Sequence, residues 1–232
     1  MTGQVIPHTS WELERLGKFT ASRISELLAE THSRDAGSKP VLSGKAMSYI
    51  YEKAAEITTG TIRYADSFPI DWTIYYEAEA VDLLRSTWPE LTYFRESAPK
   101  YFALTDFSGG SPDAVDFTER TVFEIQCPEN PVHHIACTRI DSDEILQKTD
   151  RKSYYQLQMN MLAVSRHLKC DFFLMRGVFV SYYPHIHEDF HKLHKVDVYP
   201  DWDFFKKIYP VLEVAEGQLA EIISNLTILD FE

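Results

Sequence analysis

The chain has 232 residues, of which 44% are hydrophobic and 25% charged, and its formal net charge is −12. These values are ordinary for a soluble globular protein and exclude disordered, collagen-like and disulfide-scaffold chains. The acidic balance disfavours passive nucleic-acid binders, which usually carry a basic patch. It does not exclude enzymes whose carboxylates hold metal ions, because those ions supply positive charge next to a phosphate.

The sequence shows no membrane-spanning run or secretory signal, and its cysteines suit a reducing compartment. No apolar run approaches the roughly 20 residues that cross a bilayer. The N-terminal stretch up to Arg15 lacks the basic and apolar segments of a secretory signal. Cys127, Cys137 and Cys170 are odd in number and include no Cys-x-x-Cys pair. We therefore expect a cytoplasmic protein with no membrane partner.

The N-terminal part of the chain predicts mainly helices. Apolar spacing indicates a short first helix that Gly17 can end, and Thr20 can cap a second helix that reaches about Glu30. The polar residues 31–44 predict a loop, and residues 61–70 look irregular. Helical spacing predicts two further helices, at 44–58 and 71–87.

The remainder alternates strands and helices. Short runs rich in aromatic and β-branched residues predict strands at 93–94, 101–104, 114–117, 122–127 and 170–183. Helical spacing predicts helices at 142–168 and 201–226. This order suits an α/β chain with a mixed β-sheet flanked by helices, and no convincing linker interrupts it. We expect one domain over residues 1–232.

The most informative stretch runs from Ser111 to Pro128. Asp113 starts one predicted strand and Glu124 lies within the next, and an antiparallel hairpin brings such positions close together. Two neighbouring carboxylates repel each other unless a cation lies between them, and carboxylate oxygens suit magnesium or manganese. Strand alternation places Gln126 on the same face as Glu124. The simpler alternative is a solvent-exposed polar face on an edge strand.

These residues resemble the PD-(D/E)XK nuclease motif, in which Pro-Asp precedes a hairpin and an acidic-x-Lys triplet follows. Ser-Pro-Asp followed by Glu-Ile-x-Cys-Pro is similar to the lambda-type phage exonucleases and the related YqaJ-like viral recombinase nucleases. The similarity covers about residues 11–165, with three further matching segments in the expected order at 11–22, 72–80 and 154–158. The resemblance implies a restriction-endonuclease-like α/β core.

The resemblance also implies a role for each matched residue. Asp113 and Glu124 would bind Mg²⁺ or Mn²⁺ together with the main-chain carbonyl of Ile125. Glu77 would hold metal-bound water, and Gln158 would orient water or substrate. Each of these side chains also has a purely structural alternative: Glu77 as a solvated helix residue and Gln158 as part of a buried polar network.

Two further residues would meet the 5′-phosphate of a DNA end. Ser22 is expected near a helix start, where free N–H groups and the helix dipole favour an anion. Arg15 can hold a phosphate with two parallel hydrogen bonds. The structural alternatives are a surface charge for Arg15 and an ordinary helix residue for Ser22.

The implied activity is magnesium-dependent hydrolysis of linear double-stranded DNA from the 5′ to the 3′ direction. The resemblance further implies a ring-shaped homotrimer, a single-strand annealing protein as partner, and a role in phage-type recombination in a bacterial or phage-infected cell. A ring would let an acidic protein stay on DNA.

One matched position departs from the motif, because Gln126 stands where lysine is expected. Glutamine can hydrogen-bond water but supplies no positive charge, and losing such an electrostatic group costs about 10²–10³ in rate. Gln126 can be a working variant in a two-metal site, or Lys148 or Lys152 can fill the place. Alternatively, the chain is a weakened or inert nuclease-fold protein that binds DNA ends or a partner.

A histidine cluster offers a more distant alternative. His191 and His194 would share a face if this segment were helical, and could then bind zinc. His185 and His187 would share one side of an extended segment. The simpler interpretation is a polar loop. His133 and His134 follow the metal strand and could reach the site or DNA. Aromatic residues elsewhere, such as Tyr154 and Tyr155, could stack on unpaired bases, but most of them are expected to pack in the core.

Overall fold

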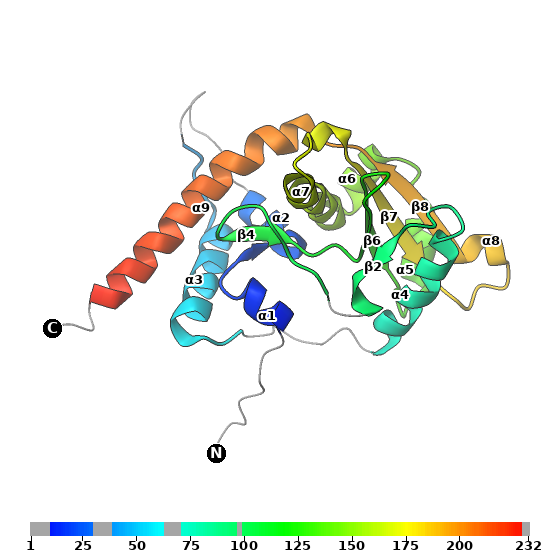
Figure 1. Ribbon diagram of the computed structural model, residues 1–232, viewed down its shortest axis with the longest axis horizontal. Helices are drawn as coiled ribbons and strands as arrows, with labels where there is room; N and C mark the ends of the chain where they lie inside the picture. Colours follow the sequence, from blue (N-terminus) through cyan, green and yellow to red (C-terminus); the bar gives the residue numbers. More distant parts are fainter. Residues whose placement is uncertain (1–9, 30–38, 63–70, 97–98, 229–232) are drawn as a thin grey trace, which may run out of the picture.

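The computed structural model describes residues 10–29, 39–62, 71–96 and 99–228. Its main sheet has five strands in the order β2-β5-β6-β7-β8 (Figure 1). β6 and β7 run parallel and the other neighbouring pairs antiparallel, so the sheet is mixed as expected. The strands are β2 (Thr92–Tyr93), β5 (Ala114–Asp116), β6 (Thr121–Gln126), β7 (Arg176–Tyr182) and β8 (Leu193–Val198).

A second, three-stranded sheet has the order β1-β4-β3. It joins the N-terminal segment to the middle of the chain, because β1 pairs with β4 in parallel although the two are far apart in sequence. These strands are short: β1 (Phe19–Thr20), β3 (Phe102–Ala103) and β4 (Ser108–Gly110). The pairing brings residues just after Gly17 beside the segment that leads into Asp113.

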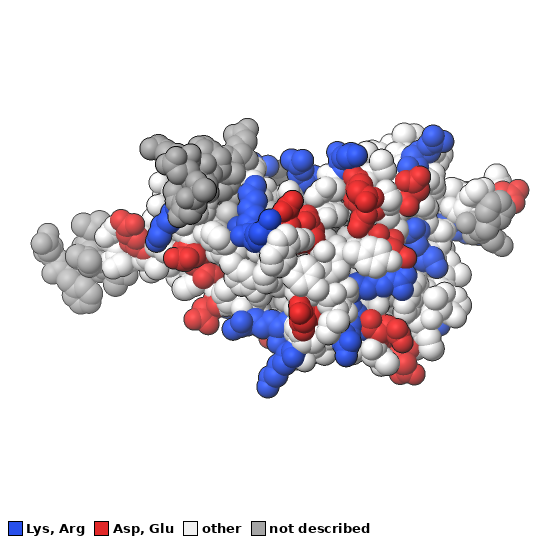
Figure 2. Space-filling model, turned by 90° about the horizontal axis from the view of Figure 1, so that it is seen from above, with Lys and Arg blue, Asp and Glu red and all other residues white. Residues whose placement is uncertain are grey.

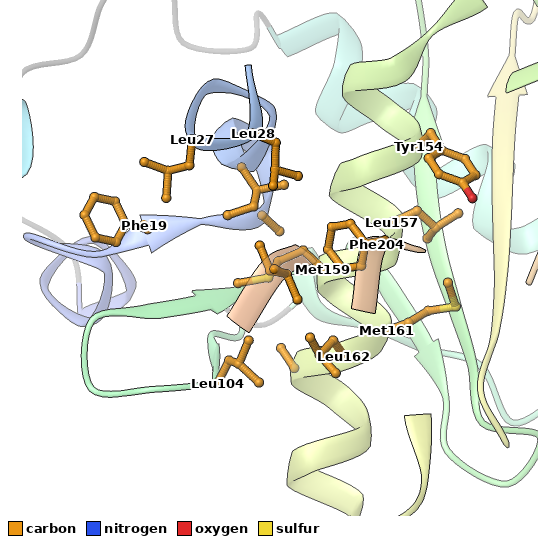
Figure 3. Packing of buried hydrophobic residues seen from close by; sticks show 14 of the residues in the cluster. Phe19, Leu27, Leu28, Leu104, Tyr154, Leu157, Met159, Met161, Leu162 and Phe204 are labelled. Carbon is orange, nitrogen blue, oxygen red and sulfur yellow. The ribbon is translucent and has the colours of Figure 1, made fainter. Parts of the chain in front are cut away.

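Helix α7 (Arg151–Leu168) lies between the two sheets, contacting β4 on one side and β6 and β7 on the other (Figure 1). Figure 3 shows its core-facing side chains, with Leu157 and Met161 on one side and Met159 on the other, toward Leu27 and Leu28. The helix approaches β7 closely, since a Cβ at Gly177 would lie 2.8 Å from the Leu157 side chain. This packing fixes how α7 faces β6.

The other face of the main sheet is covered by α4 (Asp71–Leu84). Ala80, Val81 and Leu84 of this helix form a second core cluster with Phe123 and Ile125 of β6. Val122, in contrast, belongs to the larger cluster that contains α7. Because successive side chains of β6 point to opposite faces of the sheet, they pack into two hydrophobic cores, one on each face.

The remaining helices surround these layers. α9 packs against α2 and α3 (Figure 1), and no described helix is long and apolar enough to span a bilayer. The helical elements are α1 (Ser10–Arg15), η1 (Ala21–Arg23), α2 (Ile24–Leu28), α3 (Gly44–Thr59), η2 (Phe94–Glu96), α5 (Pro131–Cys137), α6 (Asp143–Thr149), η3 (Phe172–Leu174), α8 (Asp189–Lys192) and α9 (Trp202–Ile228).

Several predicted elements are confirmed and others are corrected. α3 ends at Gly60, which adopts a left-handed φ of 64°, and α9 closes the chain as expected. The helix predicted over 142–168 is two helices, because the side chain of Asp150 caps α7 by accepting from the Ser153 N–H. β4 and β8 were not predicted as strands. Residues 31–38 of the loop expected at 31–44, and residues 63–70 of the irregular segment expected at 61–70, lie outside the described residues.

Candidate functional site

A cavity of about 470 Å³ gathers most of the predicted site residues. The sequence-predicted residues that line it are Arg15, Ser22, Glu77, Asp113, Glu124, Ile125 and Gln126. Gln158 is the predicted residue that does not line it. Other residues of the cavity wall include Trp11, Thr20, Arg95, Cys127, Lys152 and Gln156. The ordered segments that suggested a shared site in the sequence therefore meet in space.

Three buried carboxylates form one side of the cavity, which we call the carboxylate wall: Glu77, Asp113 and Glu124. The pairing of Ala114 with Phe123 in the β5–β6 hairpin puts Asp113 and Glu124 opposite each other. Asp113 is held there because its Oδ2 accepts from the Ile125 N–H at 2.7 Å. The hairpin juxtaposition predicted from sequence is thus present, and the polar face of β6 is not solvent-exposed.

Arg95 of η2 lies among these carboxylates and was not predicted from the sequence. Its Nη1 is 3.1 Å from Glu77 Oε1, and its Nη2 is 3.6 Å from Asp113 Oδ1. Tyr93 also donates to Glu77, at 3.3 Å. A single guanidinium therefore serves as the counter-ion of two buried acids.

One guanidinium does not compensate three buried carboxylates. Burial, followed by the negative charge of Asp113, raises the pKa of Glu77 to about 8. Burial and the charges of Asp113 and Glu77 raise the pKa of Glu124 well above its usual range. Burial also raises the pKa of Asp113, although Arg95 and the Ile125 N–H oppose this. The wall holds more negative charge than its surroundings neutralise, which is the electrostatic condition of a cation site.

Three residues of helix α7 contact the polar side chains of β6. Gln156 Nε2 donates to Glu124 Oε1 at 2.6 Å, and Asn160 makes a longer contact of 3.5 Å with the same carboxylate. Toward the N-terminus of the helix, Gln126 Nε2 donates to Ser153 Oγ at 2.7 Å. The amide of Gln126 is thus bound to the first turn of α7.

Gln158 lies outside the cavity, on a different face of α7, and takes part in a buried polar network, which is the structural alternative considered for it. Its Nε2 donates to the main-chain oxygen of Tyr199 at 2.7 Å, and its Oε1 accepts from the Asp201 N–H at 3.0 Å. Gln158 is fully buried and joins α7 to the segment before α9. Residues two apart on a helix point in nearly opposite directions. Gln156 therefore takes the place in the cavity that was expected for Gln158.

Another part of the cavity lining, which we call the N-terminal wall, comprises Trp11, Arg15, Thr20, Ala21 and Ser22. The guanidinium of Arg15 lies 4.2 Å from the centre of the Trp11 ring. Trp11 in turn donates to Ser111 Oγ at 3.2 Å. This chain of contacts ties Arg15 to the segment that precedes Asp113.

The local structure around Ser22 differs from the expectation. Thr20 precedes η1, a single 3₁₀ turn, and makes no side-chain cap hydrogen bond. Its Oγ1 instead lies 3.2 Å from Ser22 Oγ. This segment therefore offers an anion hydroxyl groups and Arg15, rather than the dipole of a long helix.

The donors on the carboxylate wall fit a hard divalent cation. Among the described residues no three His, Cys, Asp or Glu side chains are arranged to ligate one metal ion. Magnesium does not require such a set, because it commonly takes one or two carboxylates and keeps several waters. Asp113, Glu124 and Ile125 all line the cavity, and the two carboxylates provide oxygen donors of this kind.

The histidines do not form a zinc site in the part of the chain that the structure describes. His194 lies on β8, not on a helix with His191, and its Nε2 contacts the Ile140 carbonyl at 2.7 Å. His185 packs against Trp72 and Tyr76. His134 is buried between Ser181 and the His191 carbonyl, so it serves packing.

No family model matches this chain, and no curated protein matches it. Solved structures do match it, and three of them cover nearly the whole chain. The alkaline exonuclease LHK-Exo from Laribacter hongkongensis superposes with a TM-score of 0.71 at 19% identity, covering 95% of this chain and 96% of that one. LHK-Exo in complex with dAMP gives 0.70 at 20% identity, with the same coverage. A phage-related exonuclease from Haemophilus somnus gives 0.65 at 17% identity, covering 90% and 96%.

The chain has the fold of these exonucleases. The resemblance to lambda-type nucleases inferred from four short segments is confirmed at the level of the fold, and so is the mixed α/β architecture. The superposition extends beyond residue 165, where the sequence resemblance weakened. The C-terminal strands and α9 therefore belong to the shared fold.

Proposed function

We propose that this chain is a metal-dependent DNA exonuclease acting on the ends of linear duplex DNA. The observation that carries the proposal is the cavity itself: the buried carboxylates of Glu77, Asp113 and Glu124 line the same space as Arg15 and Ser22. This cavity lies in a fold shared with exonucleases. The remaining polar groups each have a place in phosphodiester hydrolysis.

Asp113, Glu124 and the main-chain oxygen of Ile125 would hold Mg²⁺ or Mn²⁺. Such a cation supplies Lewis acidity and lowers the pKa of an attacking water. Its charge would also relieve the repulsion that raises the pKa values of the carboxylate wall. Gln156 fixes the Glu124 carboxylate through Oε1, and Arg95 fixes Glu77 and Asp113, so the donors are oriented before a cation arrives.

Hydrolysis joins the oxygen of a water molecule to phosphorus and breaks the bond from phosphorus to the 3′ oxygen, which takes up a proton. Arg15 is placed to hold the terminal 5′-phosphate, because its planar guanidinium can donate two parallel hydrogen bonds. The hydroxyls of Thr20 and Ser22 can add neutral donors. A terminal phosphate held at this wall favours removal of nucleotides from the 5′ end.

Retention on DNA must come from more than a broad basic surface. Figure 2 shows basic and acidic side chains interspersed over one face of the molecule, and the net charge is −12. Contacts within the cavity and topological enclosure by a homotrimeric ring would meet this need. We propose this assembly, with a single-strand annealing protein as a partner that uses the product.

The test is digestion of 5′-phosphorylated linear duplex DNA with Mg²⁺, comparing wild type with Asp113→Asn. We expect loss of duplex that EDTA abolishes and that falls about 10³-fold in the variant, since the metal supplies several kcal/mol of stabilisation. Covalently closed circular duplex should resist, which separates exonuclease from endonuclease activity. Glu119→Gln, an exposed change in the β5–β6 turn, serves as the matched control.

Two outcomes would contradict the proposal. Equal activity of Asp113→Asn would remove the site from the chemistry. Absence of digestion by wild type, restored when Gln126 is changed to lysine, would identify a weakened nuclease that retains the fold.

A further inference from the structure

Hydrolysis increases the negative charge on the oxygen atoms around phosphorus. A cationic side chain that faces the substrate phosphate would stabilise this charge. The described residues that line the cavity include three cationic side chains: Arg15, Arg95 and Lys152. Arg95 is engaged with Glu77 and Asp113 on the carboxylate wall. Arg15 lies over the Trp11 ring, on the N-terminal wall. Neither lies on α7, where Gln126 is bound.

The register between β6 and α7 brings Gln126 to Ser153, the residue that follows Lys152, and both Gln126 and Lys152 line the cavity. Glu124 and Gln126 are two residues apart on one strand face. Their partners on α7, Gln156 and Ser153, are about one helical turn apart. Lys152 is adjacent to Ser153 in sequence.

Lys152 also shares a face with Gln156, since residues four apart on a helix are neighbours. Both line the cavity. Lys152 is solvent-exposed, whereas Glu124 is buried, so the lysine stands at the entrance and the carboxylate lies deeper. Lys148, which belongs to α6, is not among the residues of the cavity wall.

We propose that Lys152 is the cation that contacts the scissile phosphate, while Gln126 anchors the first turn of α7 through Ser153. The inference rests on the proposed exonuclease function and extends it to a residue that belongs to a helix rather than to β6. The ammonium group of Lys152 would donate hydrogen bonds to a non-bridging phosphate oxygen, and it forms no covalent bond. Gln126 then acts as a positioning residue.

Binding of dAMP gives a readout that does not depend on turnover. It carries a 5′-monophosphate, as does the new 5′ end that cleavage of the bond to the 3′ oxygen leaves on the shortened DNA, and this new 5′-phosphate is the group that Lys152 would contact in the product. We expect Lys152→Met to weaken dAMP binding about tenfold by calorimetric titration in Mg²⁺, since a hydrogen bond to a charged group contributes about 1.5 kcal/mol or more. Lys152→Arg should retain most of the affinity. Lys148→Met, an exposed lysine outside the cavity, is the matched control and should bind as wild type does.

Activity then tests the division of roles. Lys152→Met should lower kcat about 10²-fold with little change in the KM for DNA ends, and Gln126→Lys in the same chain should restore part of it. Thermal denaturation of each variant checks that the fold is kept. Wild-type protein that binds no dAMP, or Lys152→Met protein that binds it equally well, overturns the proposal. If dAMP binding behaves as expected but wild type digests no DNA, the exonuclease function fails and the phosphate contact stands.

Discussion

The two walls of the cavity are built in different ways. The carboxylate wall stands on the main sheet, where strand register fixes Asp113 and Glu124, and on α4, which carries Glu77; burial raises the pKa of all three acids. The N-terminal wall stands on a short helix and a single 3₁₀ turn, with Arg15 supported by the Trp11 ring. The rigid wall suits chemistry, which demands accurate placement of donors. The wall made of short segments suits recognition of a DNA end.

Among the substitutions that distinguish the roles of the two walls, we expect a change at Arg15 to have the largest effect on the rate of digestion. Arg15→Gln should remove a preference for 5′-phosphorylated over 5′-hydroxyl duplex of roughly 10–100-fold, because hydrogen bonds to a charged group contribute about 1.5–3 kcal/mol. Turnover on long DNA once bound should change little. The measurement is initial rate on the two end types with the same sequence.

Arg139→Gln is the control for that experiment, since Arg139 is exposed and is not among the residues of the cavity wall. If Arg15→Gln slows both substrates equally, Arg15 serves the reaction itself or the fold, and the assignment of end recognition to the N-terminal wall is wrong.

The carboxylate wall predicts a pH dependence of stability in metal-free protein. The pKa of Glu77 is about 8 in the folded chain and about 4.5 when unfolded. A carboxyl group whose pKa is higher in the folded than in the unfolded state stabilises the fold fully at pH values below the unfolded-state pKa. This stabilisation is lost as the pH rises through the folded-state pKa. In EDTA the melting temperature should therefore fall between pH 5 and pH 9, by roughly 5 °C.

Two comparisons sharpen this expectation. Glu77→Gln should reduce the fall, because the amide does not ionise. Added Mg²⁺ should raise the melting temperature more at pH 8 than at pH 6, since cation binding displaces protons from the wall. A melting temperature that is flat from pH 5 to pH 9 in EDTA would mean that the three acids are neutralised by some other group.

Sequence reasoning succeeded where periodicity and a hairpin determine position. The juxtaposition of Asp113 with Glu124 follows from one turn and strand alternation, and both were predicted correctly. Helices with a clear apolar stripe, such as α3 and α9, were also predicted near their observed bounds. Here local pattern and tertiary structure agree, so the pattern was sufficient.

Sequence reasoning failed where the position of a residue depends on partners that are distant in the sequence. Arg95 follows a two-residue strand, and nothing local indicates that its guanidinium lies between Glu77 and Asp113. β4 contains two glycines and is a strand because it pairs with β1 and β3. Likewise, β8 is set by its pairing with β7, so His194 lies on a strand and does not share a helical face with His191 of α8. Such elements are defined by their neighbours rather than by propensity.

The choice between Gln156 and Gln158 lies between these cases and gives the smallest expected effect. Helical geometry shows that both cannot face one site, but only the packing of α7 shows which one does. Gln156→Ala should lower the rate about tenfold, because loss of a group that orients a metal ligand typically costs 10–100-fold, while stability changes little. Gln158→Ala should leave kcat near wild type and lower the unfolding free energy by about 1 kcal/mol or more, since two buried main-chain groups lose their partner. Initial rates and denaturant unfolding of both variants check this, each serving as the control for the other.

The reverse result, with Gln158→Ala inactive and stable, would place the cavity on the wrong face of α7. Since Lys152 shares its face with Gln156, that result would also remove the geometric basis for assigning it to the phosphate.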